Sequence, residues 1–325
     1  MVAHIDTDCT VHPYSGDTRY ATAAQGVLDA FPHGSDGVVI ASGEGYADAI
    51  SASGLAGALG YPVMITASTY LPAETTAAID ALRSGRDGFR IIVVGGETSV
   101  SGDVFWVLGS TYGWGNLERL YGATRYDTCA AVCAAAPAGS WGGTAVVCSG
   151  TGYADALSAS AYAYAAKAPV LLAGEGGYLS QSELSAVEGD PSISRVVLVG
   201  GDAVLPESVG SLFPGRDTVR VSGDTRYSTS AAVCGFAASD GVLSWSDCGF
   251  ATGDAFPDAL AAGPAQGSRG GMLLLASSSD YSADEPVVEA LASAGGADDV
   301  RWYGGPAAIS DVARAYLLDA ANGRY

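Results

Sequence analysis

The chain has 325 residues, of which 48% are hydrophobic and 15% charged, so it is long and apolar enough for two or three compact modules. Its 35 acidic and 15 basic residues give a net charge of −20, which argues strongly against nucleic acid or an anionic membrane surface as a partner. No apolar run approaches the roughly 18 residues of a membrane-spanning helix, so no membrane insertion is expected.

Three short motifs recur in the same order three times. Each set begins with an Arg-Tyr pair, continues with an aspartate in an Ala/Pro-Asp-Ala frame and closes with a double glycine. The arginine-to-aspartate separations are 29, 30 and 32 residues. Because the motifs stay in register, the sequence predicts three copies of one module. The motif residues are Arg19, Tyr20, Asp48, Gly95 and Gly96; Arg125, Tyr126, Asp155, Gly200 and Gly201; and Arg226, Tyr227, Asp258, Gly304 and Gly305.

The pattern within each repeat predicts alternating helices and strands. An alanine-rich helix is expected after each Arg-Tyr pair, and Asp17 or Thr18 can cap the first copy. Short apolar runs bounded by glycine loops are typical of strands buried on both faces. Such strands, alternating with helices, predict parallel sheets covered on both sides. The expected helices are 20–30, 126–136 and 227–238, and the expected strands are 10–14, 37–41, 62–66, 90–94, 117–121, 145–148, 169–173, 195–199, 218–222, 249–251, 272–276 and 300–303.

The fold class expected is therefore α/β, with three tandem Rossmann-like modules. The motifs divide the chain into an N-terminal segment, 1–16, and three repeats, 17–122, 123–223 and 224–325. No strand follows Ala320 in the third repeat. We therefore expect the N-terminal strand 10–14 to complete the third sheet and close the units into a ring.

The six cysteines form an even set without the spacing of metal ligands, which predicts disulfides and an oxidising, extracellular setting. Cys133 and Cys234 both lie on expected helices, and each is followed about fifteen residues later by a cysteine near an expected strand. The expected disulfides are Cys133 with Cys148 and Cys234 with Cys248. No metal site is expected.

The motif residues fall just beyond the carboxyl ends of strands, where doubly wound sheets bind ligands. The aspartates can accept hydrogen bonds from sugar hydroxyls, and the arginines suit phosphate or carboxylate. For the arginines at 19, 125 and 226 the alternative is an internal ion pair with the aspartates at 48, 155 and 258. The double glycines are interpreted as tight turns in preference to anion sites. No glycine loop is a full G-x-G-x-x-G, so neither a dinucleotide nor any other cofactor is expected.

Catalysis fits the repeat poorly. The three histidines, His4, His12 and His33, lie only in the first unit or its leader, and no G-x-S-x-G or zinc signature occurs. The aspartates have no obvious second carboxylate at a matching position. A site present in triplicate favours multivalent binding, so no enzymatic activity is expected.

The repeated motifs resemble the type 2 cell-wall-binding repeats of Gram-positive surface proteins. The resemblance covers essentially the whole chain and implies a pseudo-threefold triangle of Rossmann-like modules. It also implies an extracellular protein at the cell wall that noncovalently binds an anionic wall polysaccharide or teichoic-like polymer. An effector domain, which commonly accompanies such repeats, is expected to be absent from this chain. The alternatives are an adhesin for a host ligand and an enzyme acting on glycans. The expected polymer-binding residues are Arg19, Tyr20, Asp48, Arg125, Tyr126, Asp155, Arg226, Tyr227 and Asp258.

Overall fold

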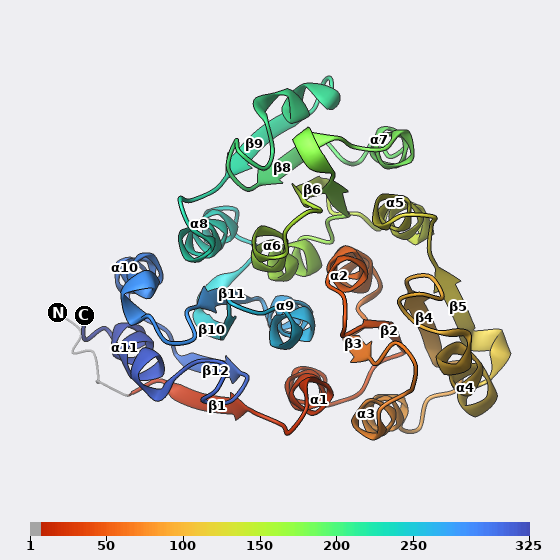
Figure 1. The fold of residues 1–325 in the computed structure, drawn as a ribbon, viewed down its shortest axis with the longest axis horizontal. Helices are drawn as coiled ribbons and strands as arrows, with labels where there is room; N and C mark the ends of the chain where they lie inside the picture. The colour runs from red at the N-terminus through yellow and green to blue at the C-terminus, as the bar shows by residue number, and fades with distance from the viewer. Residues whose placement is uncertain (1–7) are drawn as a thin grey trace.

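The computed structural model describes residues 8–325, which form three four-stranded parallel sheets with helices packed against them (Figure 1). The expected α/β class is confirmed. The sheet orders are β3-β2-β4-β5, β7-β6-β8-β9 and β11-β10-β12-β1. We call these sheets, with their helices, the first, second and third units.

The inner strands are buried along most of their length because helices cover both faces of each sheet. Alternate residues of β6 therefore pack into different parts of the core, which explains the continuous apolar runs. The strands are β1 (Thr10–Tyr14), β2 (Gly37–Ser42), β3 (Val63–Thr66), β4 (Arg90–Val94), β5 (Leu117–Leu120), β6 (Thr144–Ser149), β7 (Val170–Ala173), β8 (Arg195–Val199), β9 (Asp217–Val221), β10 (Ser244–Thr252), β11 (Gly271–Ala276) and β12 (Asp299–Tyr303).

The first helix of each unit begins at the repeated arginine because the preceding threonine caps it. Thr18, Thr124 and Thr225 each accept a hydrogen bond from a backbone N–H in the first turn. Among residues 8–325, no helix is both long and apolar enough to cross a bilayer. The α-helices are α1 (Arg19–Ala30), α2 (Ala47–Leu59), α3 (Ala73–Arg83), α4 (Gly102–Tyr112), α5 (Arg125–Ala135), α6 (Ala154–Ala165), α7 (Gln181–Glu188), α8 (Arg226–Ser239), α9 (Pro257–Arg269), α10 (Glu285–Ala294) and α11 (Asp311–Ala321). Short 3-10 helices are η1 (Trp114–Asn116), η2 (Glu175–Gly177), η3 (Glu207–Leu212) and η4 (Tyr281–Asp284).

The third sheet takes its outer strand from the start of the chain. β1 pairs in parallel with β12 from Thr10 opposite Asp299 to Tyr14 opposite Tyr303. In the other two units the corresponding strand, β5 or β9, comes from just before the next repeat. The three units therefore close into a ring, as expected, with α2, α6 and α9 packed around its centre (Figure 1).

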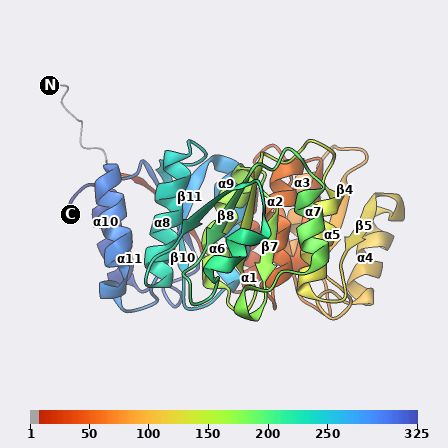
Figure 2. The same cartoon turned by 90° about the horizontal axis from the view of Figure 1, so that it is seen from above.

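The molecule is a plate about one helix long in its thickness. Helices that are seen end-on in Figure 1 run across the plate in Figure 2. The loops that follow β2, β6 and β10 meet at the centre of the ring, where Tyr46, Tyr153 and Phe256 touch. The carboxyl ends of all three sheets consequently open on one flat side, which we call the carboxyl face.

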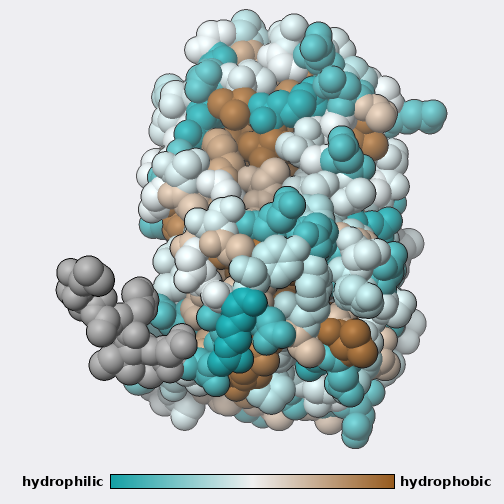
Figure 3. Space-filling model, turned by 90° about the vertical axis from the view of Figure 1, so that its left-hand side faces the viewer, coloured by the Kyte–Doolittle hydropathy of each residue, from teal (hydrophilic) through white to brown (hydrophobic). Residues whose placement is uncertain are grey.

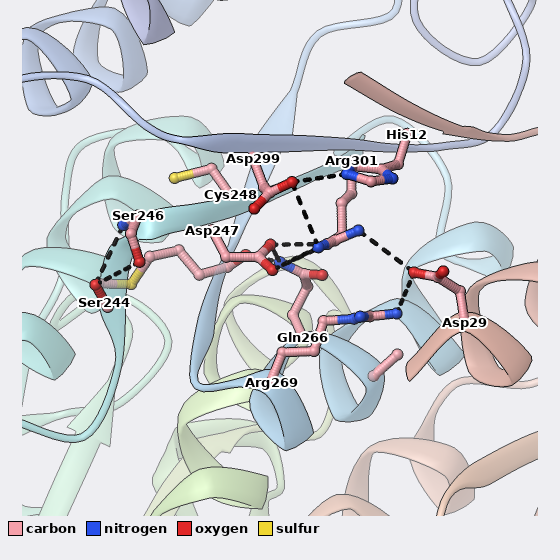
Figure 4. A network of polar contacts seen from close by, with 12 residues as sticks. His12, Asp29, Ser244, Ser246, Asp247, Cys248, Gln266, Arg269, Asp299 and Arg301 are labelled. Carbon is pink, nitrogen blue, oxygen red and sulfur yellow. Dashed lines mark hydrogen bonds and ion pairs between the residues drawn. The ribbon is translucent and has the colours of Figure 1, made fainter. Parts of the chain in front are cut away.

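Near the opposite, amino ends of the strands, a polar network joins the third unit to the first (Figure 4). Arg301 of β12 is only 8% exposed and lies 2.9 Å from Asp247 and 3.3 Å from Asp29 of α1. Arg269 of α9 also pairs with Asp29, and Tyr14 donates a hydrogen bond to the same carboxylate at 2.5 Å. The first unit is thus held to the third by ion pairs between two largely buried arginines and the partly exposed Asp29.

The first and last described segments of the chain also touch. The backbone N–H of Cys9 donates to the Asn322 side chain at 2.7 Å, and Arg324 pairs with Asp8. On this side of the molecule, apolar residues reach the surface in separate patches among hydrophilic ones (Figure 3).

The expected disulfides are wrong: all six cysteines are buried free thiols. Cys133 lies in the same part of the core as Val147, whereas Cys148, the next residue along β6, lies in another part of the core. Successive strand residues point to opposite faces, so the spacing of about fifteen residues does not bring these two sulfurs together. Cys234 and Cys248 instead donate to separate backbone carbonyls, those of Leu273 and Trp245. Burial raises the pKa of all four of these thiols.

Candidate ligand clefts between the units

The tyrosine of each Arg-Tyr pair supports the glycine loop that follows the first inner strand of its unit. A Cβ atom added to Gly43 would lie 3.0 Å from the Tyr20 ring, and the corresponding distances are 2.9 Å for Gly150 and Tyr126 and 2.8 Å for Gly253 and Tyr227. Glycine is therefore required for the backbone to lie directly on the ring. The expectation that these tyrosines touch ligand stays a prediction, since they pack beneath the loops.

The neighbouring arginines donate side-chain hydrogen bonds to the backbone of the same glycine loops. Arg19 donates to the carbonyl oxygen of Gly43 at 2.7 Å, and Arg125 donates to that of Gly150 at 2.7 Å. Arg226 donates to the carbonyl of Gly253 in the same way. Each guanidinium has five N–H donors, so these bonds leave others free to face the surface.

Three aromatic side chains that the sequence analysis did not select meet at the ring centre. The rings of Tyr46, Tyr153 and Phe256 lie 5.7 to 6.0 Å apart, edge to face. Tyr46 reaches across to the second unit, where its hydroxyl donates to the Gly150 carbonyl at 2.9 Å and accepts from Arg125 at 2.9 Å. Each immediately precedes the Ala/Pro-Asp-Ala frame, which was the available sequence signal.

The second unit reaches across to the third unit in the same way, but the third unit makes no such contact with the first. Tyr153 donates to the Asp254 carbonyl at 2.9 Å and accepts from Arg226 at 3.3 Å. The corresponding residue of the third unit is Phe256, which has no hydroxyl. Arg19 therefore has the Gly43 carbonyl as its bonding partner but no bridging tyrosine.

The repeated aspartates lie in the first turns of α2, α6 and α9, as expected. Burial raises the pKa of Asp48, Asp155 and Asp258, and an arginine of the following unit opposes that shift in each case. These arginines are Arg125 for Asp48, Arg226 for Asp155 and Arg19 for Asp258. The electrostatic partners therefore belong to neighbouring units. Among the ion pairs within residues 8–325, none joins a repeated arginine to a repeated aspartate.

Each junction between units contains a cleft on the carboxyl face, lined by an aspartate of one unit and the arginine of the next. The 1/2 cleft holds Asp48 and Arg125 in about 400 Å³. The 2/3 cleft holds Asp155 and Arg226 in about 360 Å³. The 3/1 cleft is the largest, at about 630 Å³, and holds Asp258 and Arg19 together with Asp17 and Asp254.

The double glycines form turns at the edges of these clefts. The first glycine of each pair, Gly95, Gly200 or Gly304, has a φ between 110° and 128°, which favours glycine. Its N–H bonds to the adjacent outer strand, at Leu120, Val221 or Tyr14, so this group is not free for an anion. A Cβ atom on Gly95 would also lie 2.5 Å from the Asp48 carboxylate. The turn interpretation therefore fits, and the turns position the aspartates.

The two described histidines lie outside the cleft linings. His12 instead lies 2.7 Å from Asp299 in β12. His4 lies outside the described residues. Within residues 8–325, no group of three or more His, Cys, Asp or Glu side chains could hold a metal ion.

Residues 14–105, 119–210 and 220–313 each match the sequence model of the family described as Cell wall binding domain 2 (CWB2). Over 226 residues, 70% of this chain, the sequence is 32% identical to the N-acetylmuramoyl-L-alanine amidase LytC of Bacillus subtilis (strain 168). Over 221 residues, 68% of the chain, it is 28% identical to the Amidase enhancer of the same organism. The matches cover 43% and 28% of those two proteins.

Two solved structures from Clostridium difficile share the fold. Cwp8 superposes with a TM-score of 0.81 and Cwp6 with 0.82, each at 23% sequence identity. Each likeness covers 98% of this chain, but only 52% of Cwp8 and 48% of Cwp6.

Proposed function

Because the chain belongs to the Cell wall binding domain 2 family, we propose that it is a non-catalytic module that retains a protein at the bacterial cell surface by binding an anionic secondary wall polymer. The observation that carries the proposal is the threefold recurrence of one cleft on one face, with an aspartate from one unit opposite an arginine from the next. Three weak contacts to one polymer gain avidity without a single tight site.

Each cleft offers two kinds of polar group to such a polymer. The arginine, at the start of α1, α5 or α8, suits a phosphate or carboxylate because guanidinium donors and helix N-terminal dipoles both favour negative charge. The aspartate carboxylate can accept a hydrogen bond from a sugar hydroxyl. Acidic residues more than about 8 Å from the polymer are largely screened at physiological ionic strength, so the net charge of −20 does not prevent binding.

The test is cosedimentation of the whole chain with purified Gram-positive cell walls, before and after chemical removal of the secondary polymer. We expect binding only to the unstripped walls. Changing Arg19, Arg125 and Arg226 together to glutamine should weaken binding at least about tenfold, because three cationic contacts are lost. The matched control changes Arg83, Arg90 and Arg324, which do not line the clefts, and removes the same charge.

Circular dichroism would verify that both triple variants stay folded. Equal binding by the two variants would refute the role of the clefts. Binding that survives stripping of the secondary polymer would favour the peptidoglycan itself, and binding to host cells instead of walls would favour an adhesin. Release of soluble sugar or peptide fragments from the walls would favour an enzyme.

A further inference from the structure

A fourth repeated feature lies on the carboxyl face, outside the Arg-Tyr, aspartate and double-glycine motifs. In each unit, the connection from the outer strand β3, β7 or β11 to the next helix carries a tyrosine four or five residues beyond the strand end, and in the third unit this tyrosine begins η4. Tyr70 is 59% exposed, Tyr178 is 62% exposed and Tyr281 is 51% exposed. A single exposed aromatic residue needs no explanation, but the same exposed residue in all three units does.

Backbone hydrogen bonds join the ends of these outer strands to the glycine loops that lead into the clefts. The N–H of Gly43 donates to the Thr66 carbonyl at 2.8 Å, and the N–H groups of Gly150 and Gly253 make the matching bonds to Ala173 and Ala276. In the third unit the tyrosine loop itself enters a cleft, because Ser278 lines the 3/1 cleft. The tyrosines therefore follow strand ends that are bonded to the glycine loops of the clefts, on the same face.

Hydrogen bonds fix the backbone around each tyrosine. The Thr66 hydroxyl donates to the Tyr70 carbonyl at 3.3 Å, and the N–H of Gly174 donates to the Tyr178 carbonyl at 2.7 Å. In the third unit the buried Asp284 accepts from the Ser277 N–H at 2.7 Å. An aromatic ring on a fixed loop loses little conformational entropy when it binds, since tyrosine has only two side-chain torsions.

The chemistry of these positions fits a sugar ring. The face of a phenol ring is apolar and carries partial negative charge, so it can pack against the C–H groups on one face of a pyranose. The hydroxyls at the edge of that pyranose need polar partners, which the cleft aspartates and arginines supply. A glycerol or ribitol phosphate chain has no ring to stack.

We propose that Tyr70, Tyr178 and Tyr281 are stacking sites for pyranose rings of a wall polysaccharide whose neighbouring residues occupy the clefts. This inference rests on the proposed function and adds the class of polymer. Each ring contributes modestly, and the three together extend the contact from the clefts over the carboxyl face.

The experiment measures binding of the whole chain to purified secondary wall polysaccharide and, in parallel, to poly(glycerol phosphate) lipoteichoic acid. Changing all three tyrosines to alanine should weaken polysaccharide binding about tenfold or more, while the triple phenylalanine variant should stay within about threefold of the wild type. Wild-type binding to the glycerol phosphate polymer should be much weaker. The control variant Trp106→Ala with Trp114→Ala removes two exposed aromatic rings that lie outside these loops, in α4 and η1, and should bind normally.

Normal polysaccharide binding by a folded triple alanine variant would overturn the stacking sites, and so would equal binding of the two polymers by the wild type. If the arginine variant of the clefts loses binding in the same assay, only this inference fails and the proposed function stands. If the wild type binds neither polymer nor walls, both fail.

Discussion

The junction between the third and first units differs from the junction between the first and second, although the repeat places the same motifs at both. At the 1/2 junction, helix α2 packs so closely on the second unit that a Cβ atom at Gly57 would lie 1.9 Å from the Tyr164 carbonyl oxygen. Tyr46 then bridges to Arg125. At the 3/1 junction, Phe256 leaves Arg19 unbridged, the cleft is larger, and ion pairs of the largely buried Arg301 and Arg269 with the partly exposed Asp29 hold the units together.

The comparison indicates that an ion pair at a junction is not tied to a break in the chain. The 2/3 junction is continuous in sequence like the 1/2 junction, yet Arg195 of β8 pairs there with Asp240 at the end of α8. The 3/1 junction is made by residues nearly three hundred positions apart, such as Asp29 and Arg301. Directional ion pairs fix its register, and the cleft above it keeps more room for ligand.

The largest effect is expected at Arg301. Its replacement by alanine should lower the free energy of unfolding by about 3 kcal/mol, because the Asp247 carboxylate, which is only 17% exposed, loses its ion-pair partner. Arg90→Ala is the matched control, since Arg90 and its partner Glu118 are both about half exposed and should contribute less than about 1 kcal/mol. Urea unfolding would measure both. Equal losses in the free energy of unfolding would contradict the expected difference between the buried and the exposed arginine.

At the 1/2 junction, Gly57→Ala should cost about 1–3 kcal/mol because the added methyl group meets the Tyr164 backbone. The control is Gly235→Ala in α8, where no atom lies within 4 Å of the added carbon. That change should be neutral or stabilise by up to about 1 kcal/mol, since alanine is the better helix former. Equal melting temperatures of the two variants would contradict the close packing of α2 at the 1/2 junction.

Acid should weaken the 3/1 junction. Burial acts to raise the pKa of Asp29, but the Tyr14 hydroxyl and the two arginines outweigh it and hold the pKa below the ordinary value of 3.8. The stabilisation is therefore present above 3.8 and is lost as the pH falls through the lower, folded value. In Asp29→Asn the melting temperature should be lower at neutral pH and should fall less steeply below pH 4. A curve parallel to that of the wild type would contradict this role of Asp29.

The smallest effect is expected from exchanging the bridging rings. Phe256→Tyr should tie Arg19 to the third unit, as Tyr46 ties Arg125, and weaken wall binding about threefold if Arg19 contacts the polymer. Tyr153→Phe should release Arg226 and have the opposite effect. Cosedimentation with graded amounts of wall would measure both. Opposite changes in wall binding by the two variants would support the difference between the clefts, and unchanged binding by both would refute it.

Much of the fold follows from local signals. The continuous apolar runs predicted parallel strands, and the N-terminal run 10–14 was assigned to the third sheet because that repeat lacked a last strand of its own. β10 is longer than expected because it continues back to Ser244 past a register shift before Cys248, where polar residues hide the strand. The cysteine spacing misled because separation along the chain does not tell which sheet face a side chain meets.

The candidate site was predicted less completely. The repeat identified Arg19, Asp48 and their equivalents, but each cleft takes its arginine from one unit and its aspartate from another, which motif order within a unit cannot reveal. The exchange of tyrosine for Phe256 gains meaning only when the three rings meet at the centre. Tyr70, Tyr178 and Tyr281 were missed because an exposed tyrosine in a loop resembles any other until the units are superimposed.

The pairing of β1 with β12 also sets an order for folding during synthesis. The sheets of the first and second units contain only their own strands, so each can form as soon as residue 120 or 221 has left the ribosome. The third sheet waits for β12, and until then β1 has no partner and offers an open strand edge. Ring closure is thus the last and slowest step, because its contacts are the most distant along the chain.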